Sequence, residues 1–149
     1  MEKTNVMRLL DQHKVPYQAF HRLESPPEGL SVYKTLVTQA KSGQHYVFVI
    51  PVEASLDLKK AAKASGEKAI HMIKEKELLP LTGYVHGGCS PLGMKKGFPT
   101  FFDQSASQKE VIVFSAGKVN YSVGLKLAHI QPMFKFQLAD LVSSPVFDS

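Results

Sequence analysis

The sequence predicts a single α/β domain, in which a mixed, largely antiparallel β-sheet or a partly open barrel has helices packed around it. Segments rich in β-branched and aromatic residues come in pairs, and segments with helical spacing interrupt these pairs. This order differs from the strict strand–helix repeat that is typical of parallel sheets. The 149 residues leave room for one hydrophobic core, so we expect one domain over residues 1–149.

The first half of the chain is expected to alternate strands with three short helices. The expected helices are residues 4–13, 55–66 and 74–79. The expected strands are residues 17–21, 32–38, 46–51 and 69–73, with a loop over residues 24–29. Thr4 and Ser55 are suitable N-caps for the first two helices, Gly66 ends the second, and Pro16 and Pro80 follow the first and third. The turn Lys41-Ser42-Gly43 makes a hairpin of the second and third strands.

The second half begins with a glycine-rich stretch, residues 82–97, which has five glycines and is therefore expected to be a loop. The strands expected after it are residues 99–103, 111–115 and 121–127. A turn at Ala116-Gly117-Lys118 joins the last two of these strands, and a closing helix is expected over residues 132–142. Long ordered loops are often functional, which makes residues 82–97 a candidate site.

Composition excludes several classes of protein and of site. The longest apolar run, residues 46–51, is too short to span a membrane, and the first residues do not resemble a secretory signal, so we expect a cytoplasmic protein. A single cysteine excludes an internal disulfide and a multi-thiolate metal site. The net charge of +5 favours weak attraction to polyanions, although a charge of this size also serves solubility.

Lys34 is the most unusual residue of the chain. It lies in a segment, residues 32–37, in which both faces of the strand are largely apolar, as in a covered strand. A buried ammonium without a partner is too costly to keep, so Lys34 must reach water, pair with an acid or project into a polar cleft. An edge lysine that reaches solvent is the simpler alternative.

The loop from Gly87 to Gly97 is the second candidate. Its glycines allow the backbone to approach a ligand closely and to present N–H groups to carbonyl or phosphate oxygens. The spacing from Gly88 to Gly93 resembles a phosphate-binding P-loop, but Met94 stands where that motif requires lysine. A purely structural turn remains the alternative.

Cys89 and the histidines give weaker signals. Cys89 lies close to His86, but no orienting acid or amide can be assigned to a nucleophilic pair, so a nucleophilic role is not favoured. The six histidines show no spacing typical of metal ligands, and no metal site is expected. The lysines that could form a basic rim for a nucleic-acid backbone are Lys59, Lys60, Lys63, Lys95, Lys96 and Lys118. A solvated face explains the same lysines equally well.

Three segments together resemble the YbaK/EbsC family, whose domain also occurs as the editing domain inserted in bacterial prolyl-tRNA synthetases. They are residues 32–37 (VYKTLV), 56–63 (LDLKKAAK) and 82–96 (TGYVHGGCSPLGMKK). Their order and spacing agree with the family from about residue 4 to residue 142. The lysine strand combined with the Gly-Gly-x-Ser-Pro-Leu-Gly loop is specific, whereas either alone is weak.

The resemblance implies an enzyme that hydrolyses the ester between an amino acid and the 3′ end of a mischarged tRNA, typically Cys or Ala on tRNA for proline. It implies Lys34 as the residue important for activity, and Gly88 and Ser90 as backbone donors to a developing oxyanion. The residues that it implies around the substrate are Tyr17, Phe20, Arg22, Tyr33, Gly87, Cys89, Pro91, Gly117 and Ser122. No metal or organic cofactor is expected. The implied partners are the aminoacyl-tRNA acceptor end and prolyl-tRNA synthetase, with a monomer or weak homodimer as the assembly.

The chain departs from the family pattern in three places. The stretch between Ser25 and Val32 is shorter than usual, so either this wall of the pocket is reduced or a segment is missing there. The acidic residue that relatives carry shortly after Gly-Lys is absent after Lys118, and Arg22 stands where relatives often have an aromatic residue. The alternative to a deacylase is therefore a non-catalytic module that keeps the fold and binds tRNA or a protein.

Overall fold

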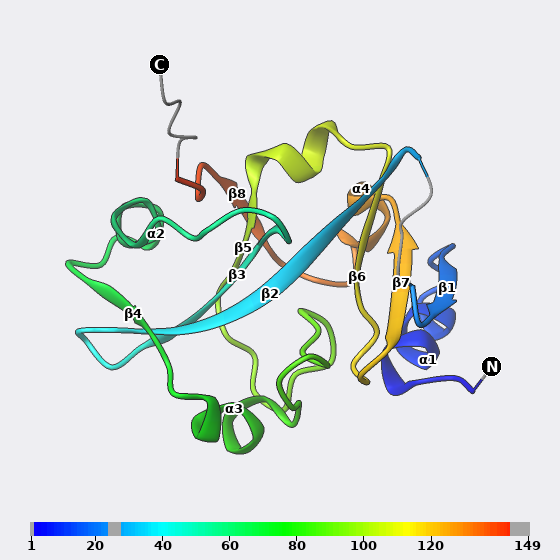
Figure 1. Ribbon diagram of the computed structural model, residues 1–149, viewed down its shortest axis with the longest axis horizontal. Helices are drawn as coiled ribbons and strands as arrows, with labels where there is room; N and C mark the ends of the chain where they lie inside the picture. Colours follow the sequence, from blue (N-terminus) through cyan, green and yellow to red (C-terminus); the bar gives the residue numbers. More distant parts are fainter. Residues whose placement is uncertain (1, 24–27, 144–149) are drawn as a thin grey trace.

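A computed structural model describes residues 2–23 and 28–143, and within these residues eight strands join in one mixed sheet (Figure 1). The strands are β1 (Gln18–His21), β2 (Leu30–Ala40), β3 (His45–Pro51), β4 (Ile70–Met72), β5 (Thr100–Asp103), β6 (Val111–Ser115), β7 (Tyr121–Leu125) and β8 (Gln137–Ala139). The helices are α1 (Asn5–Gln12), α2 (Leu58–Ser65), α3 (Glu75–Thr82), the 3-10 helix η1 (Gln104–Gln108) and α4 (Leu127–Ile130).

The sheet has the order β1-β7-β6-β2-β3-β5-β8, and β4 pairs with β2 outside this path. Four of its strand pairs are antiparallel and three, β2 with β6, β3 with β5 and β5 with β8, are parallel. The mixed α/β class expected from the sequence is confirmed. In the described part of the chain the path ends at β1 and β8, which leaves the sheet open.

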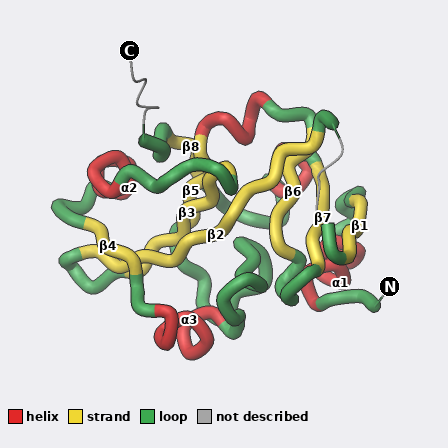
Figure 2. The backbone as a smooth tube through the Cα atoms, viewed as in Figure 1, coloured by secondary structure: helices red, strands yellow, loops and turns green. Residues whose placement is uncertain are grey.

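Two apolar clusters hold the helices against the sheet. The larger cluster combines Val6, Met7 and Leu10 of α1 with the buried side chains of β3, β6 and β7. The smaller cluster packs Ala61 and Ala62 of α2 against the opposite face of β3 and against β4. Because alternate residues of β3 point to opposite faces, one strand serves both clusters. Figure 2 shows the long loop between α3 and β5, which carries the glycine-rich segment.

Most of the expected elements are present. Thr4 caps α1 by accepting a hydrogen bond from Met7 N–H at 3.2 Å, and Gly66 ends α2 in the left-handed conformation, as the sequence predicts. The hairpin of β2 and β3, the strand β4 and the hairpin of β6 and β7 are confirmed. Of the loop expected over residues 24–29, residues 24–27 lie outside the described part of the chain.

Two helix boundaries differ from expectation. The N-cap of α2 is Asp57 rather than Ser55, because the Asp57 carboxylate accepts hydrogen bonds from two backbone N–H groups of the first turn. Pro80 lies inside α3 instead of ending it, and the helix continues to Thr82, where the Thr82 hydroxyl donates to Leu78 C=O at 2.8 Å. Pro80 is exposed, so water can reach the carbonyl that lacks a partner.

The expected closing helix over residues 132–142 is wrong. The chain forms α4 first and then the strand β8, which runs parallel to β5. Phe134, Phe136 and Leu138 alternate with polar residues, which is strand periodicity, and the Phe136 ring packs against Phe102 with 5.1 Å between centroids. Pairing with the free edge of β5 therefore overrides the helical propensity of the segment.

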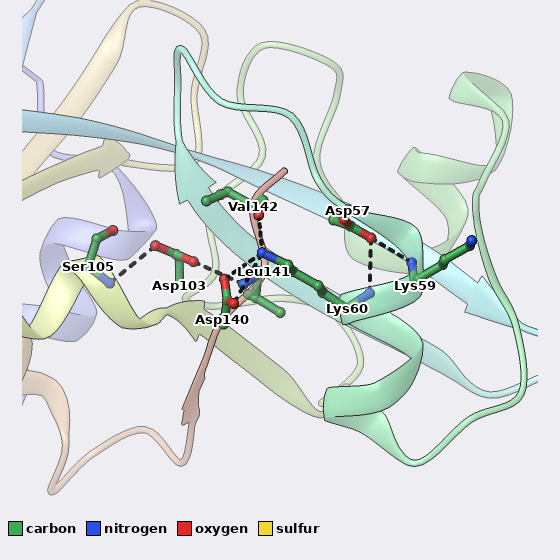
Figure 3. A network of polar contacts seen from close by, with 8 residues as sticks. All are labelled: Asp57, Lys59, Lys60, Asp103, Ser105, Asp140, Leu141 and Val142. Carbon is green, nitrogen blue, oxygen red and sulfur yellow. Dashed lines mark hydrogen bonds and ion pairs between the residues drawn. The ribbon is translucent and has the colours of Figure 1, made fainter. Parts of the chain in front are cut away.

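The C-terminal segment is fastened by a polar network that Asp103 and Lys60 anchor (Figure 3). The Asp103 side chain is buried, and its two oxygens accept from Ser105 N–H and Leu141 N–H, each at 3.1 Å. The Lys60 ammonium donates to Val142 C=O at 2.7 Å and pairs with Asp140. Asp103 thus joins the chain after β8 to β5, and Lys60 joins it to α2.

We expect Asp103→Asn to lower the free energy of unfolding by about 1 kcal/mol, because an amide can accept from only one of the two buried N–H groups. Urea denaturation measures this loss. The matched control is Asp140→Asn, which removes an exposed ion pair and should cost less than about 0.5 kcal/mol. Equal losses in the two variants would contradict this account of the network.

Candidate functional site

A cavity of about 300 Å³ opens where β2 separates from β6. The two strands pair only up to Val32 and Val113, and β4 begins to pair with β2 only at Thr38. Residues 33–36 of β2 therefore have β3 on one side and no strand on the other. The glycine-rich loop and the β6–β7 hairpin complete the walls of this cavity.

The open edge of β2 directs backbone polar groups toward the cavity. Val32 C=O accepts from Val52 N–H, and Ala40 N–H donates to Gln44 C=O, so the even-numbered residues of β2 point their backbone groups toward β3. The backbone groups of Thr35, an odd-numbered residue, point the opposite way. The Thr35 hydroxyl is also buried and has no hydrogen-bond partner among the described residues. Thr35 thus lines the cavity with a hydroxyl that lacks a partner and with backbone groups that face the edge without a neighbouring strand.

Lys34 lines the same cavity and is half-buried. It stands opposite Ile50 of β3, and its neighbours Tyr33 and Thr35 belong to the other face of the strand, as the alternation of the sequence predicts. No ion pair among the described residues involves Lys34. Its charge is therefore available to a ligand of the cavity.

The glycine-rich loop contributes three residues to the cavity. His86, Gly87 and Cys89 line it, whereas Gly88, Ser90 and Pro91 are buried and do not. Gly88 N–H donates to Val85 C=O at 2.9 Å, and the Ser90 hydroxyl accepts from Leu92 N–H. The N–H of Gly88, one of the donors expected from the sequence, is thus engaged within the loop, and Ser90, the other, is buried and does not line the cavity. The N–H of Cys89 has no acceptor among the described residues.

Close packing fixes the loop in this position. The backbone of Gly88 lies so close to the β6–β7 turn that a Cβ would come within 3.0 Å of Val119 N. The Tyr84 hydroxyl donates to Leu92 C=O at 2.5 Å, which ties the two ends of the loop together. Burial raises the pKa of Tyr84 to about 12, so its phenol stays neutral and keeps this hydrogen bond.

Gly117 contributes to the packing of the loop and not to the lining of the Lys34 cavity. A Cβ on Gly117 would lie 2.9 Å from Cε1 of Tyr84 and 3.1 Å from Val6, and its φ is +91°. The residue is thus a turn glycine against which the Tyr84 ring packs, and it lines a second cavity next to α1 rather than the Lys34 cavity.

Burial raises the pKa of the Cys89 thiol to about 12. At about pH 8 roughly one thiol in ten thousand is then ionised, which makes Cys89 a poor nucleophile.

We expect the rate at which iodoacetamide alkylates Cys89 to keep rising about tenfold per pH unit between about pH 8 and pH 10, a range in which the rate for glutathione levels off. A plateau near about pH 8 would show a reactive thiolate and restore the nucleophilic interpretation. Mass spectrometry of the protein after timed alkylation measures the rate.

The β6–β7 hairpin supplies the remaining polar wall. Ser122 lines the cavity as expected, and Ser115, its antiparallel partner, lines it as well. The Tyr121 ring also lies there and stacks on His21 with 4.4 Å between centroids, while the Lys118 ammonium lies 5.4 Å from the Tyr121 centroid. Sequence reasoning missed Thr35, Ser115 and Tyr121. The pairing of Ser115 with Ser122 across the predicted turn could have indicated one of them.

The residues expected from the first strand lie elsewhere. Tyr17 packs against the larger apolar cluster, and the Phe20 ring lies against Gly124 of β7. Arg22 is exposed, and its N–H donates to Asn120 C=O at 2.6 Å. Tyr33 lines the cavity, but its hydroxyl is hydrogen-bonded to Ser105 at 2.7 Å. The structure does not bring Tyr17, Phe20 or Arg22 to the cavity, because β1 packs on the far side of β7 from β6.

The six lysines do not form one rim. Lys60 is engaged with Asp140 and Val142, and α2, which carries Lys59 and Lys63, lies at the opposite end of the molecule from α1 (Figure 1). Lys95 and Lys118 line a second cavity next to α1. Lys96 is exposed on the loop beside Lys95.

Within residues 2–23 and 28–143, no three His, Cys, Asp or Glu side chains gather as a metal site would require. In the same ranges no helix combines the length and the apolar character needed to span a membrane.

Comparison with known proteins relates the fold and the cavity to one family. The family model of the aminoacyl-tRNA editing domain matches residues 19–132, more than half of the chain. A protein of Enterococcus faecalis, described as a candidate Cys-tRNA(Pro)/Cys-tRNA(Cys) deacylase, EbsC, is 41% identical, and the match covers 95% of this chain and 94% of the relative.

Solved structures show the same fold at low identity. A candidate trans-editing enzyme for prolyl tRNA synthetase superposes with a TM-score of 0.79 at 19% identity, covering 97% of this chain and all of the other. A hypothetical protein superposes with a TM-score of 0.80 at 16% identity, covering 94% of this chain and all of the other. At these identities the structures support the fold alone.

Proposed function

Because the chain belongs to the aminoacyl-tRNA editing domain family, we propose that it is an aminoacyl-tRNA deacylase that hydrolyses, in trans, the ester of a mischarged tRNA. The substrate class that we propose is cysteinyl- or alanyl-tRNA for proline. The identity of 41% to the EbsC relative over nearly the full length of both chains supports this activity. The matched region includes both Lys34 and the glycine-rich loop.

The observation that carries the proposal is the cavity where Lys34 meets the loop. Lys34 of β2 and the loop residues Gly87 and Cys89 line it together, and we propose that the Lys34 ammonium and the loop N–H groups point into it. An aminoacyl ester needs a positive group and N–H donors around its carbonyl oxygen, because negative charge develops on that oxygen as the ester is attacked.

The reaction needs no nucleophile from the protein. Water attacks the ester carbon, the bond from this carbon to the ribose oxygen breaks, and this oxygen leaves as a hydroxyl with the proton that the water gives up. If the thiol of a cysteinyl substrate attacks instead, it gives up its proton to the same oxygen, and water then opens the cyclic thioester that forms. We assign stabilisation of the oxyanion to Lys34 and to the N–H of Cys89, in place of Gly88, whose N–H is engaged within the loop. The side chain of Cys89 serves as a neutral wall of the cavity.

Thr35 and Ser122 are proposed to hold the amino acid itself. The buried Thr35 hydroxyl has no other partner among the described residues, and Ser122 lies across the cavity on β7. A substrate ammonium or thiol that donates to these oxygens would satisfy them, which favours small polar or sulfur-containing amino acids.

The proposal also covers the assembly, the cellular compartment and the partner of the enzyme. We propose one domain over residues 1–149 that acts as a monomer or weak homodimer in the cytoplasm and receives its substrate from prolyl-tRNA synthetase.

The direct experiment is a deacylation panel. Purified protein is incubated with tRNA for proline that carries labelled cysteine, alanine or proline, and with correctly charged Cys-tRNA, and release of the amino acid is followed over time. We expect release from the mischarged tRNAs above the rate in buffer, with proline retained. Tight tRNA binding without release from any member of the panel would instead favour the non-catalytic module.

A further inference from the structure

A second cavity, of about 480 Å³, lies against the first turn of α1. Its walls are residues 2–8, the segments of the glycine-rich loop around residues 82–84 and 93–95, and residues 116–118 of the β6–β7 turn. The Lys34 cavity uses different residues of the same loop and hairpin, so one wall separates the two cavities. In this wall Gly88 packs directly against the backbone of Lys118 and Val119.

The cavity beside α1 is strongly basic. Its lining contains the cationic side chains of Lys3, Arg8, Lys95 and Lys118, and a single acid, Glu2. All five side chains are exposed, so a ligand can reach them from solvent. An excess of positive charge within one concave surface attracts anions more strongly than the same charges spread over the molecule.

Two of these cations already have acidic partners. Lys118 forms an ion pair with Glu2, and Lys3 pairs with Asp11 of α1. The Arg8 guanidinium has no ion pair among the described residues and donates to the neutral side chain of Asn5, at 3.2 Å. Lys95 takes part in no ion pair among the described residues. Arg8 and Lys95 therefore carry the charge that protein groups leave uncompensated.

We propose that this basic cavity binds backbone phosphates of the RNA strand whose 3′ end occupies the Lys34 cavity. The inference rests on the proposed function and adds to it a site that positions the polynucleotide. A strand that enters the Lys34 cavity by its terminal ester must leave across one of the cavity's walls. The wall formed by the loop and the hairpin has the basic cavity, with the unpaired Arg8 and Lys95, directly behind it. Phosphate contacts of this kind position a nucleic acid without reading its sequence.

Charge-reversal variants distinguish phosphate binding in the basic cavity from catalysis of ester hydrolysis in the Lys34 cavity. The variant Arg8→Glu/Lys95→Glu is compared with the matched control Lys41→Glu/Lys68→Glu, which reverses two exposed lysines far from both cavities. Each protein is assayed with Cys-tRNA for proline and with cysteinyl-adenosine, which has the ester but no phosphates. We expect the cavity variant to lose about tenfold in kcat/KM on the tRNA relative to the short ester, mainly through KM, and the control to show no such difference. Equal effects on both substrates would overturn the proposal.

Binding of uncharged tRNA gives a second readout that needs no catalysis. For Arg8→Gln/Lys95→Gln, we expect the slope of log Kd against log salt concentration to become shallower by about 1.4, the value for two lost contacts to single-stranded phosphates. Glu2→Gln removes the one acid of the lining and releases Lys118, so it should tighten binding. An unchanged slope with the Gln pair, or no gain with Glu2→Gln, would contradict the phosphate site.

The two proposals fail in different ways. If wild-type protein hydrolyses no aminoacyl-tRNA, the proposed function fails, and the salt slope still decides whether the basic cavity binds RNA phosphates. If hydrolysis is observed but the Arg8 and Lys95 variants match wild type in both assays, only the phosphate site is overturned.

Discussion

Lys34→Ala is expected to lower kcat/KM for aminoacyl-tRNA hydrolysis about hundredfold, which corresponds to about 2.7 kcal/mol of transition-state stabilisation. The reason is electrostatic. In the partly closed cavity the ammonium has no acid partner among the described residues, so its charge acts on the oxygen that becomes negative in the transition state. Without it, only backbone N–H groups remain to stabilise this oxygen.

Single-turnover deacylation measures the loss, with thermal unfolding recorded for each variant. The matched control is Lys41→Ala, which removes an exposed lysine from the turn between β2 and β3. Lys34→Arg keeps the charge but changes its shape and reach, so an intermediate rate is expected. A Lys34→Ala rate within about threefold of wild type, in a folded protein, would contradict the assignment of Lys34.

Gly117→Ala is expected to lower the free energy of unfolding by about 3 kcal/mol. The left-handed φ of +91° costs about 1 kcal/mol for a residue with a Cβ, and the contact at 2.9 Å with the Tyr84 ring adds about 2 kcal/mol of overpacking. Because Tyr84 ties the two ends of the glycine-rich loop together, the same change should weaken hydrolysis as well.

Gly43→Ala is the matched control for Gly117→Ala. Gly43 also has a positive φ, of +96°, but nothing lies within 4 Å of its Cβ position, so this variant should lose only about 1 kcal/mol. Urea denaturation of both variants measures the difference, which isolates the contact with Tyr84. Equal losses in the two variants would show that backbone conformation alone matters at Gly117.

The parts of the fold that local patterns determine could be predicted from the sequence. The β2–β3 hairpin, the cap at Thr4 and the loop after α3 depend on residues close together in the chain, and all three are present. The closing segment could not be predicted in this way. Its strand β8 exists because β5 offers a free edge, and a partner that far along the chain leaves no local signal.

Some features of the candidate site could also be predicted from local sequence patterns, and others could not. The alternation around Lys34 and the glycines of the loop could be recognised in the sequence, and the structure brings Lys34, Gly87 and Cys89 to one cavity. Which residues of the loop face the cavity depends on its internal hydrogen bonds, such as that of Gly88 N–H to Val85 C=O. The basic cavity depends on how α1 packs against the β6–β7 turn, which brings residue 2 beside residue 118.

The most direct test of the account is a crystal structure of the protein with a non-hydrolysable analogue of the tRNA end, in which an amide replaces the ester of cysteinyl-adenosine. We expect the acyl carbonyl oxygen within about 3.2 Å of Lys34 Nζ and of the N–H of Cys89, inside the cavity at the open edge of β2. An analogue bound elsewhere, with Lys34 directed into solvent, would contradict the proposal that this cavity is where the ester is cleaved.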